Sequence, residues 1–179
     1  MPHLPNDIVE VNVKKVIAKS DALKSLFRSK LMYTRTATDE NEAAAVLRLF
    51  LLTLYYLESD KYKVEQIKSI FELKLMSQIG YEPDLYACTI CDNDASYFSI
   101  ENASLYCDKC KQAGYIALSP ATLKAMQHIV NSPIDKVFNF VIKGDSLKQL
   151  SIITQRYVFY HLDMSFKSLD YYYKVKTKG

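Results

Sequence analysis

The segment YACTICDNDASYFSIENASLYCDKCKQAG, residues 86–114, holds all four cysteines of this 179-residue chain. They form two pairs, Cys88-x-x-Cys91 and Cys107-x-x-Cys110, with fifteen residues between the pairs. Two cysteines spaced in this way in a tight turn direct both sulfurs at one metal ion, at about 2.3 Å. Two such turns supply four tetrahedral ligands. The spacing therefore predicts one zinc ion held by Cys88, Cys91, Cys107 and Cys110.

The predicted zinc ion has a structural role. Four thiolates fill every tetrahedral position and leave none for water or substrate. The segment has few large apolar residues, so we expect metal binding to supply much of its folding free energy. Two alternatives remain open. A redox dithiol would need one reactive pair beside a strand–helix unit, and an iron–sulfur cluster would use other spacings.

The rest of the chain favours helices. It contains only four glycines and five prolines, too few for an architecture built from many strands and tight turns. Its hydrophobic fraction is 49% and its charged fraction 24%, as in an ordinary globular protein. We expect a mainly α fold, a helical bundle with an inserted four-cysteine zinc ribbon or knuckle hairpin.

Periodicity and capping residues place the expected elements. Residues 8–13 alternate apolar and polar side chains, as in a half-buried strand. Residues 96–100 and 104–106 predict a short hairpin between the cysteine pairs. The helix over 42–57 is apolar nearly all round, so it is expected at the centre of the bundle. Further helices are expected from Ser20-Asp21, over 63–79 up to Gly80, from Ser119-Pro120, over 134–142 and over 144–162.

These elements divide the chain into four parts. Residues 1–19 are a strand remnant or linker, and residues 20–85 form the first helical part of the bundle. Residues 86–114 form the zinc-binding hairpin. Residues 115–179 supply C-terminal helices that pack on the bundle.

Charge and composition narrow the function only slightly. The net charge of +3 is compatible with nucleic acid but does not argue for it. No signal peptide opens the chain, and its longest apolar run, over 49–57, is too short to cross a bilayer. We therefore expect a cytosolic protein, in which thiols stay reduced.

The three histidines, His3, His128 and His161, lack partner patterns for catalysis, and no glycine-rich phosphate loop occurs. No enzymatic activity is expected.

A series of motifs surrounds the cysteine pairs. Gly80-Tyr81-Glu82-Pro83-Asp84-Leu85 precedes them, Tyr97-Phe98-Ser99 lies between them, and Ile116-Ala117-Leu118-Ser119-Pro120 follows. Arg156-Tyr157, Tyr160-His161-Leu162 and Phe166-Lys167-Ser168-Leu169 close the series. In this order, the motifs over about 71–169 resemble the helical and zinc-binding C-terminal region of the RecO family of bacterial DNA repair and recombination mediators.

The resemblance implies a non-enzymatic protein of the bacterial cytoplasm, associated with the nucleoid and active in the response to DNA damage. Members bind single- and double-stranded DNA and anneal complementary strands. They work with RecR and with the acidic C-terminal tail of single-stranded DNA-binding protein to load recombinase, and no membrane is involved. The family normally begins with an OB-fold. Too few residues precede the helices here to build one, and residues 8–13 are expected to be its last strand.

Four basic residues are candidates for contact with nucleic acid or a partner. Lys109 and Lys111 adjoin the second cysteine pair, and Arg156 and Lys167 lie in the closing motifs. Basic side chains beside aromatic ones contact phosphates and stack bases. A solvated charged surface is the alternative for each lysine. An apolar groove with a basic rim would suit an acidic–aromatic tail, and the alternative function is a zinc-stabilised interaction scaffold without DNA binding.

Overall fold

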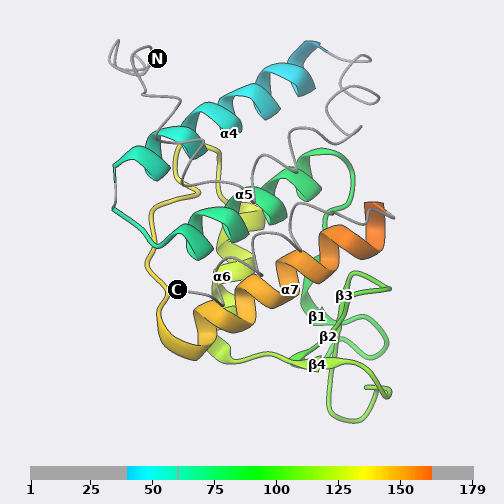
Figure 1. Ribbon diagram of the computed structural model, residues 1–179. Helices are drawn as coiled ribbons and strands as arrows, with labels where there is room; N and C mark the ends of the chain where they lie inside the picture. Colours follow the sequence, from blue (N-terminus) through cyan, green and yellow to red (C-terminus); the bar gives the residue numbers. More distant parts are fainter. Residues whose placement is uncertain (1–39, 60, 163–179) are drawn as a thin grey trace.

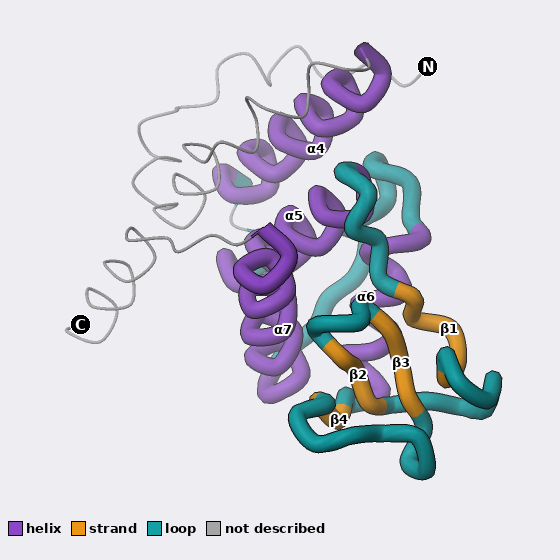
Figure 2. Tube along the Cα trace, turned by 90° about the vertical axis from the view of Figure 1, so that its right-hand side faces the viewer, coloured by secondary structure: helices purple, strands orange, loops and turns teal. Residues whose placement is uncertain are grey.

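The computed structural model describes residues 40–59 and 61–162. Within them the strands gather at the end opposite α4 (Figures 1 and 2). The expected strand over 8–13, the helix from Ser20 and Lys167 lie outside the described residues. The described elements are α4 (Glu40–Glu58), α5 (Val64–Gln78), β1 (Asp84–Cys88), β2 (Tyr97–Ser99), β3 (Ser104–Tyr106), β4 (Ile116–Ala117), α6 (Pro120–Asn131) and α7 (Gly144–Leu162).

Helix α5 lies at the centre of the described helices. It packs against α4, α6 and α7, and all eleven residues over 66–76 are buried. The prediction that the helix over 42–57 is central is wrong. That segment forms α4, whose Leu47 and Tyr55 are 51% and 43% exposed. Helix α5 takes the central position because, among the described helices, it contacts all three others.

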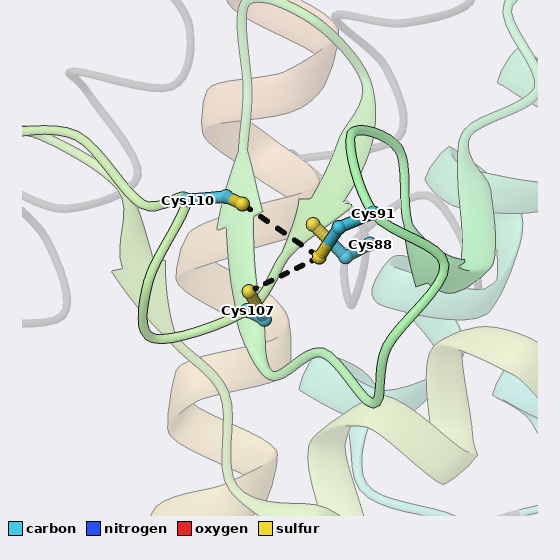
Figure 3. Close-up of side chains that lie close together, drawn as sticks. All are labelled: Cys88, Cys91, Cys107 and Cys110. Atoms are coloured by element: carbon cyan, nitrogen blue, oxygen red, sulfur yellow. Dashed lines mark hydrogen bonds between the residues drawn. The ribbon is translucent and has the colours of Figure 1, made fainter.

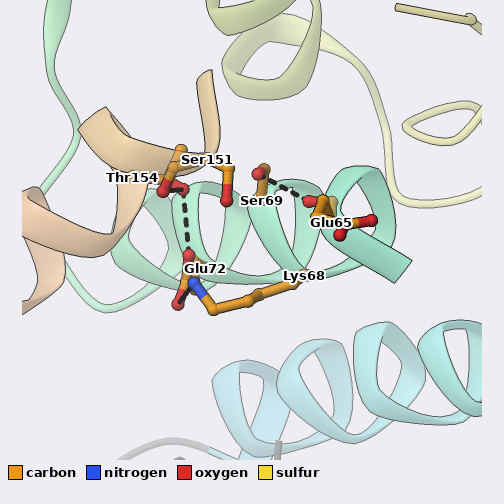
Figure 4. Close-up of polar contacts among 6 residues, drawn as sticks. All are labelled: Glu65, Lys68, Ser69, Glu72, Ser151 and Thr154. Carbon is orange, nitrogen blue, oxygen red and sulfur yellow. Dashed lines mark hydrogen bonds and ion pairs between the residues drawn. The ribbon is translucent and has the colours of Figure 1, made fainter. Parts of the chain in front are cut away.

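Because α5 is buried all round, its charged side chains need partners inside the protein. Lys68 and Glu72 form an ion pair with 2.6 Å between Nζ and Oε1, and their side chains are only 6% and 3% exposed. The other carboxylate oxygen of Glu72 accepts a hydrogen bond from the Thr154 hydroxyl of α7 at 2.9 Å (Figure 4). This hydrogen bond links the Lys68–Glu72 ion pair of α5 to α7.

Two further polar side chains join α5 to its other neighbours. Lys74 Nζ donates to the carbonyl oxygen of Val130 at 2.7 Å, in the last turn of α6, where carbonyls lack helical partners. Burial lowers the pKa of Lys74, and the nearby Glu82 carboxylate partly opposes that effect. Gln66 donates from its side-chain amide to the carbonyl oxygen of Phe140 at 2.8 Å.

The predicted helix boundaries at Gly80 and Ser119 are confirmed. Gly80 has φ +88°, the left-handed conformation that glycine adopts without strain. The next amide, of Tyr81, donates back to the Met76 carbonyl at 2.8 Å, which closes the end of α5. At the start of α6 the Ser119 hydroxyl accepts from the Thr122 amide at 3.1 Å, with Pro120 in the first turn.

The predicted helix over 134–142 is wrong. This stretch forms turns and irregular backbone, in which the Asn139 amide donates to the Lys136 carbonyl instead of continuing a helical ladder. Tertiary contacts decide its conformation. Val137 and Phe138 are buried, and Gln66 of α5 accepts from the Ile142 amide at 3.4 Å besides donating to Phe140.

The four short strands form one mixed sheet in the order β1-β3-β2-β4. Strands β2 and β3 pair antiparallel, with Phe98 opposite Leu105, as expected for the hairpin between the cysteine pairs. In addition, β1 pairs parallel to β3 and β4 pairs antiparallel to β2. The prediction of a mainly α fold therefore holds only in part, because the described residues combine helices with a mixed sheet. The ribbon form of the segment stays a prediction.

The sheet and the helices share one hydrophobic core. Leu85, Phe98 and Leu105 of the sheet belong to the same buried cluster as the helical side chains. The Phe98 ring lies 6.0 Å from that of Tyr157 on α7. Gln127 of α6 donates to the Leu85 carbonyl oxygen at 2.7 Å. The strands are thus fixed to α6 and α7 by both apolar and polar contacts.

The buried ion pair gives the first testable prediction. Replacing Lys68 by Met should lower the free energy of unfolding by about 3 kcal/mol, because Glu72 then remains buried without its cation. The double variant Lys68→Met, Glu72→Met removes both charges. Its free energy of unfolding should be much closer to that of the parent chain. Unfolding in urea, followed by circular dichroism, measures both.

The exposed pair Lys148–Asp145, whose side chains are 76% and 97% exposed, provides the control. Lys148→Met should change stability little, because exposed pairs contribute little. Equal losses in the single and double variants of the buried pair would contradict the prediction.

Candidate metal centre and nucleic-acid interface

The structure brings the four cysteines together where the parallel strands β1 and β3 end. Cys88 ends β1 and Cys107 directly follows β3, while Cys91 and Cys110 lie in the turns that follow. Their sulfurs all lie within 4.8 Å of one another and face a common point (Figure 3). Cys91 Sγ is 3.6 Å from Cys107 Sγ and 3.7 Å from Cys110 Sγ.

These distances fit a tetrahedral metal ion. With metal–sulfur bonds of about 2.3 Å, neighbouring sulfurs of a tetrahedron lie about 3.8 Å apart. A disulfide would bring two sulfurs to about 2.05 Å, and all four thiols are free. The four cysteines can therefore hold one metal ion.

Backbone amides prepare the sulfurs for this role. Burial raises the pKa of Cys88, but amide hydrogen bonds from Cys107, Ile90 and Cys91 outweigh it and lower that pKa to about 6. Hydrogen bonds to the sulfurs of Cys107 and Cys91 raise the pKa of Cys110 to about 12, because Cys110 is the donor. A metal cation would take the place of the Cys110 proton between these sulfurs.

The two cysteines that end or follow strands are buried, and the other two face outward. Cys88 and Cys107 are 0% and 7% exposed, whereas Cys91 is exposed and Cys110 intermediate. Asn93 supports the outer side, since its side-chain amide lies 3.2 Å from Cys91 Sγ. An ion here would tie two loop turns to the buried edge of the sheet, which is a structural task.

The two candidate lysines beside the second pair differ in their surroundings. Lys111 Nζ donates to the Tyr97 hydroxyl at 2.8 Å and pairs with Asp108. The same ammonium lies 4.0 Å from the centroid of the Tyr97 ring. Lys111 is thus engaged within the cysteine segment. Lys109 is exposed and forms no ion pair with a residue that the structure describes.

Arg156 is exposed on α7 and lines a cavity of about 320 Å³ between α7 and the sheet. No ion pair joins it to any described residue. The binding candidates chosen from the sequence did not include Tyr160 and Tyr115. Tyr160 belongs to the closing motifs and lies one helical turn after Arg156, which places both on one face of α7. The lining residues are Ser99, Ile100, Glu101, Ala113, Gly114, Tyr115, Arg156 and Tyr160.

A second cavity, of about 340 Å³, lies between α6 and the start of α7. Its lining includes apolar side chains, among them Phe140 and the 63% exposed Val141. Lys124 and Lys143 supply positive charge. We call this cavity the α6 groove. No sequence signal identified it, because its residues come from α6, the irregular stretch before α7 and α7 itself.

The described histidines are held by backbone contacts. His161 Nε2 lies 2.8 Å from the carbonyl oxygen of Ile100, which can only accept. His128 Nε2 lies 3.3 Å from the Lys136 carbonyl oxygen. Each side chain therefore links a helix to a neighbouring loop, whereas His3 lies outside the described residues.

Fold and site together define a class: a protein whose helical core continues into a small mixed sheet that carries four cysteines able to hold one metal ion. The chain matches the family model described as "Recombination protein O C terminal" over residues 33–170. It belongs to the RecO family of DNA repair and recombination proteins. The sequence resemblance is thereby confirmed. Among the described residues, no helix combines the length and the hydrophobicity needed to span a membrane.

Relatives named DNA repair protein RecO agree with this assignment. That of Acetivibrio thermocellus is 33% identical over 138 residues, which cover 74% of this chain and 55% of the relative. That of Thermoanaerobacter sp. is 30% identical over 140 residues, which cover 74% and 56%. The chain spans about half the length of the curated relatives it matches.

Metal removal provides the second prediction. We expect one equivalent of bound metal in the purified chain, and a fall in melting temperature of about 10 °C or more after chelation. Cys91→Ser should lower metal content, because one of four ligands is lost. Ser96→Ala, in the same segment but outside the cluster, is the control and should keep its metal. Elemental analysis and thermal melting check both. A metal-free chain with unchanged melting would contradict the structural role.

Proposed function

We propose that this chain acts as a RecO-type accessory protein of DNA repair and recombination, which binds DNA and partner proteins and catalyses no reaction. The observation that carries the proposal is the cluster of four thiols on a sheet that shares its core with the helices, in a chain of this family. We propose the bacterial cytoplasm, at the nucleoid, as its location.

We propose zinc as the ion, with Cys88, Cys91, Cys107 and Cys110 as its ligands. Zinc favours tetrahedral sites of four thiolates, and such closed sites are structural. The two buried cysteines attach to strands that enter the core, so an ion here would stabilise the sheet and its contacts with α6 and α7. In this proposal the ion keeps the binding surfaces in shape and takes no part in chemistry.

DNA binding, to single and double strands, is proposed for the basic side chains that remain free. Arg156 and Lys109 are exposed and lack carboxylate partners among the described residues. Each can contact a phosphate and release a counterion. Neutralised phosphates lower the repulsion between two strands, which would favour the annealing of complementary strands. Lys167 remains a proposed contact as well.

The α6 groove is the proposed site for a protein partner. Its apolar lining suits an aromatic side chain, and Lys124 and Lys143 suit flanking carboxylates. An acidic–aromatic segment, such as the C-terminal tail of single-stranded DNA-binding protein, has both features. We propose RecR as a further partner, and recombinase loading as the outcome of the assembly.

The same groove favours the alternative function, an interaction scaffold without DNA binding. The two functions differ in their response to salt. We predict that the chain binds a labelled oligonucleotide with an affinity that falls steeply as salt rises, because phosphate contacts release counterions. Fluorescence anisotropy at several salt concentrations measures the slope. No binding at low salt would leave the scaffold function.

For the groove, we test an acidic peptide that ends in phenylalanine. The double variant Lys124→Gln, Lys143→Gln should weaken the binding of this peptide by about three- to tenfold, since each of the two charges contributes modestly. Val141→Asp should weaken it further, because it places like charge in the apolar lining. Lys148→Gln, which removes a charge outside the groove, is the control. Equal binding by all variants would exclude the groove as the peptide site.

A further inference from the structure

The cavity between α7 and the sheet, here called the junction cavity, has fixed walls. His161 attaches the end of α7 to the Ile100 carbonyl. The Tyr115 ring packs against that of Tyr106, with centroids 4.4 Å apart, and its hydroxyl lies 3.3 Å from the side-chain amide of Asn102. Walls that are ordered before a ligand arrives lower the entropic cost of binding.

The junction cavity combines two aromatic rings with a free guanidinium. Tyr160 is 54% exposed, Tyr115 is half-buried, and Arg156 lies one turn before Tyr160 on the same face of α7. Arg156 is available for an anion because no described carboxylate pairs with it. The volume of about 320 Å³ lies within the usual range of ligand pockets, roughly 300–1,000 Å³.

Glu101 decides which anionic ligand fits. It is the one carboxylate among the lining residues. Partial desolvation, the negative charge of Glu101 and a hydrogen bond between the two side chains raise the pKa of Tyr160, so the Tyr160 hydroxyl stays neutral and donates to Glu101. An acidic peptide would bring further negative charge to Glu101. A nucleotide can keep its phosphate at Arg156 and offer the amino group of its base to Glu101.

We propose that the junction cavity binds one unstacked nucleotide of single-stranded DNA. The phosphate contacts Arg156, the base stacks on Tyr160 or Tyr115, and Glu101 accepts from an exocyclic amino group. The inference rests on the proposed function of DNA binding and names a site for it. It also predicts a base preference, because cytosine carries such an amino group and thymine does not.

The test compares labelled oligo-dC and oligo-dT by anisotropy at several salt concentrations. Arg156→Gln should reduce the salt slope by about 0.7, the value for one phosphate contact on a single strand. Lys148→Gln, which removes one charge from the same helix away from the cavity, should leave the slope unchanged. Tyr160→Ala should weaken binding about fivefold or more, the loss expected for one stacked base, without a change in slope.

Two more variants separate the roles within the cavity. Tyr160→Phe keeps the ring and should bind like the parent. Glu101→Gln should reduce the preference for oligo-dC, since the amide oxygen still accepts but has lost its charge. Cross-linking of an oligonucleotide that carries 5-iodocytosine, read by mass spectrometry, should modify Tyr160 or Tyr115. Melting curves confirm that these exposed substitutions keep the fold.

The outcomes separate DNA binding by the chain from the junction cavity as its site. A parent chain that binds no oligonucleotide at low salt overturns the proposed DNA binding itself. A parent that binds, while Arg156→Gln and Tyr160→Ala match it in affinity and slope, overturns only the cavity. Cross-links confined to residues outside the cavity do the same. If Arg156→Gln weakens the binding of an acidic peptide but leaves the binding of oligonucleotides unchanged, the cavity is a site for a protein.

Discussion

The burial of α5 is the constraint on which the rest of the structure depends. A helix enclosed on all sides must supply partners for every polar side chain it carries, and α5 carries Lys68, Glu72 and Lys74 in its buried part. The Lys68 charge is balanced by its ion pair with Glu72, Glu72 also accepts from Thr154 of α7, and Lys74 donates to the last turn of α6. These contacts fix which faces of α6 and α7 meet α5, which apolar packing alone would leave less specified.

Side-chain contacts of α7 also connect the helices to the sheet. Tyr157 packs against Phe98, and its hydroxyl donates to the Tyr81 carbonyl at 3.1 Å, just before β1. Burial raises the pKa of Tyr157 well above its ordinary value, so the hydroxyl remains a donor. The cysteines lie at and just beyond the ends of β1 and β3. Loss of an ion there would loosen β1 and β3, and with them Phe98 and Leu105, which belong to the core. An ion at the four cysteines would therefore stabilise the core that the sheet shares with the helices.

The parts of this structure that the sequence predicts are those set by local chemistry. The cysteine spacing alone predicts that four sulfurs converge, and Gly80 and Ser119 mark helix ends through backbone geometry. The predictions that failed concern segments whose conformation depends on residues distant in the sequence. Residues 134–142 carry a helical start signal, yet Gln66 holds two of their backbone groups. The central helix was misplaced because apolar residues mark α4 more clearly than α5, whose buried charges are paired only in the folded chain. Tyr115 and Glu101 join Arg156 through the sheet, which no local pattern encodes.

The two proposed binding sites use opposite ends of one helix. Ser146 at the start of α7 borders the α6 groove, and Arg156 in its second half lines the junction cavity. Ten helical residues separate them by about 15 Å, close to twice the screening length of about 8 Å at physiological ionic strength. The sites share no lining residue, so an acidic tail in the groove neither occupies the cavity nor strongly repels a phosphate there. Between these ends, the hydrogen bond from Thr154 to Glu72 anchors α7 to α5. The two proposed sites are therefore compatible with simultaneous binding of a protein tail and a DNA strand, as the proposed accessory function requires.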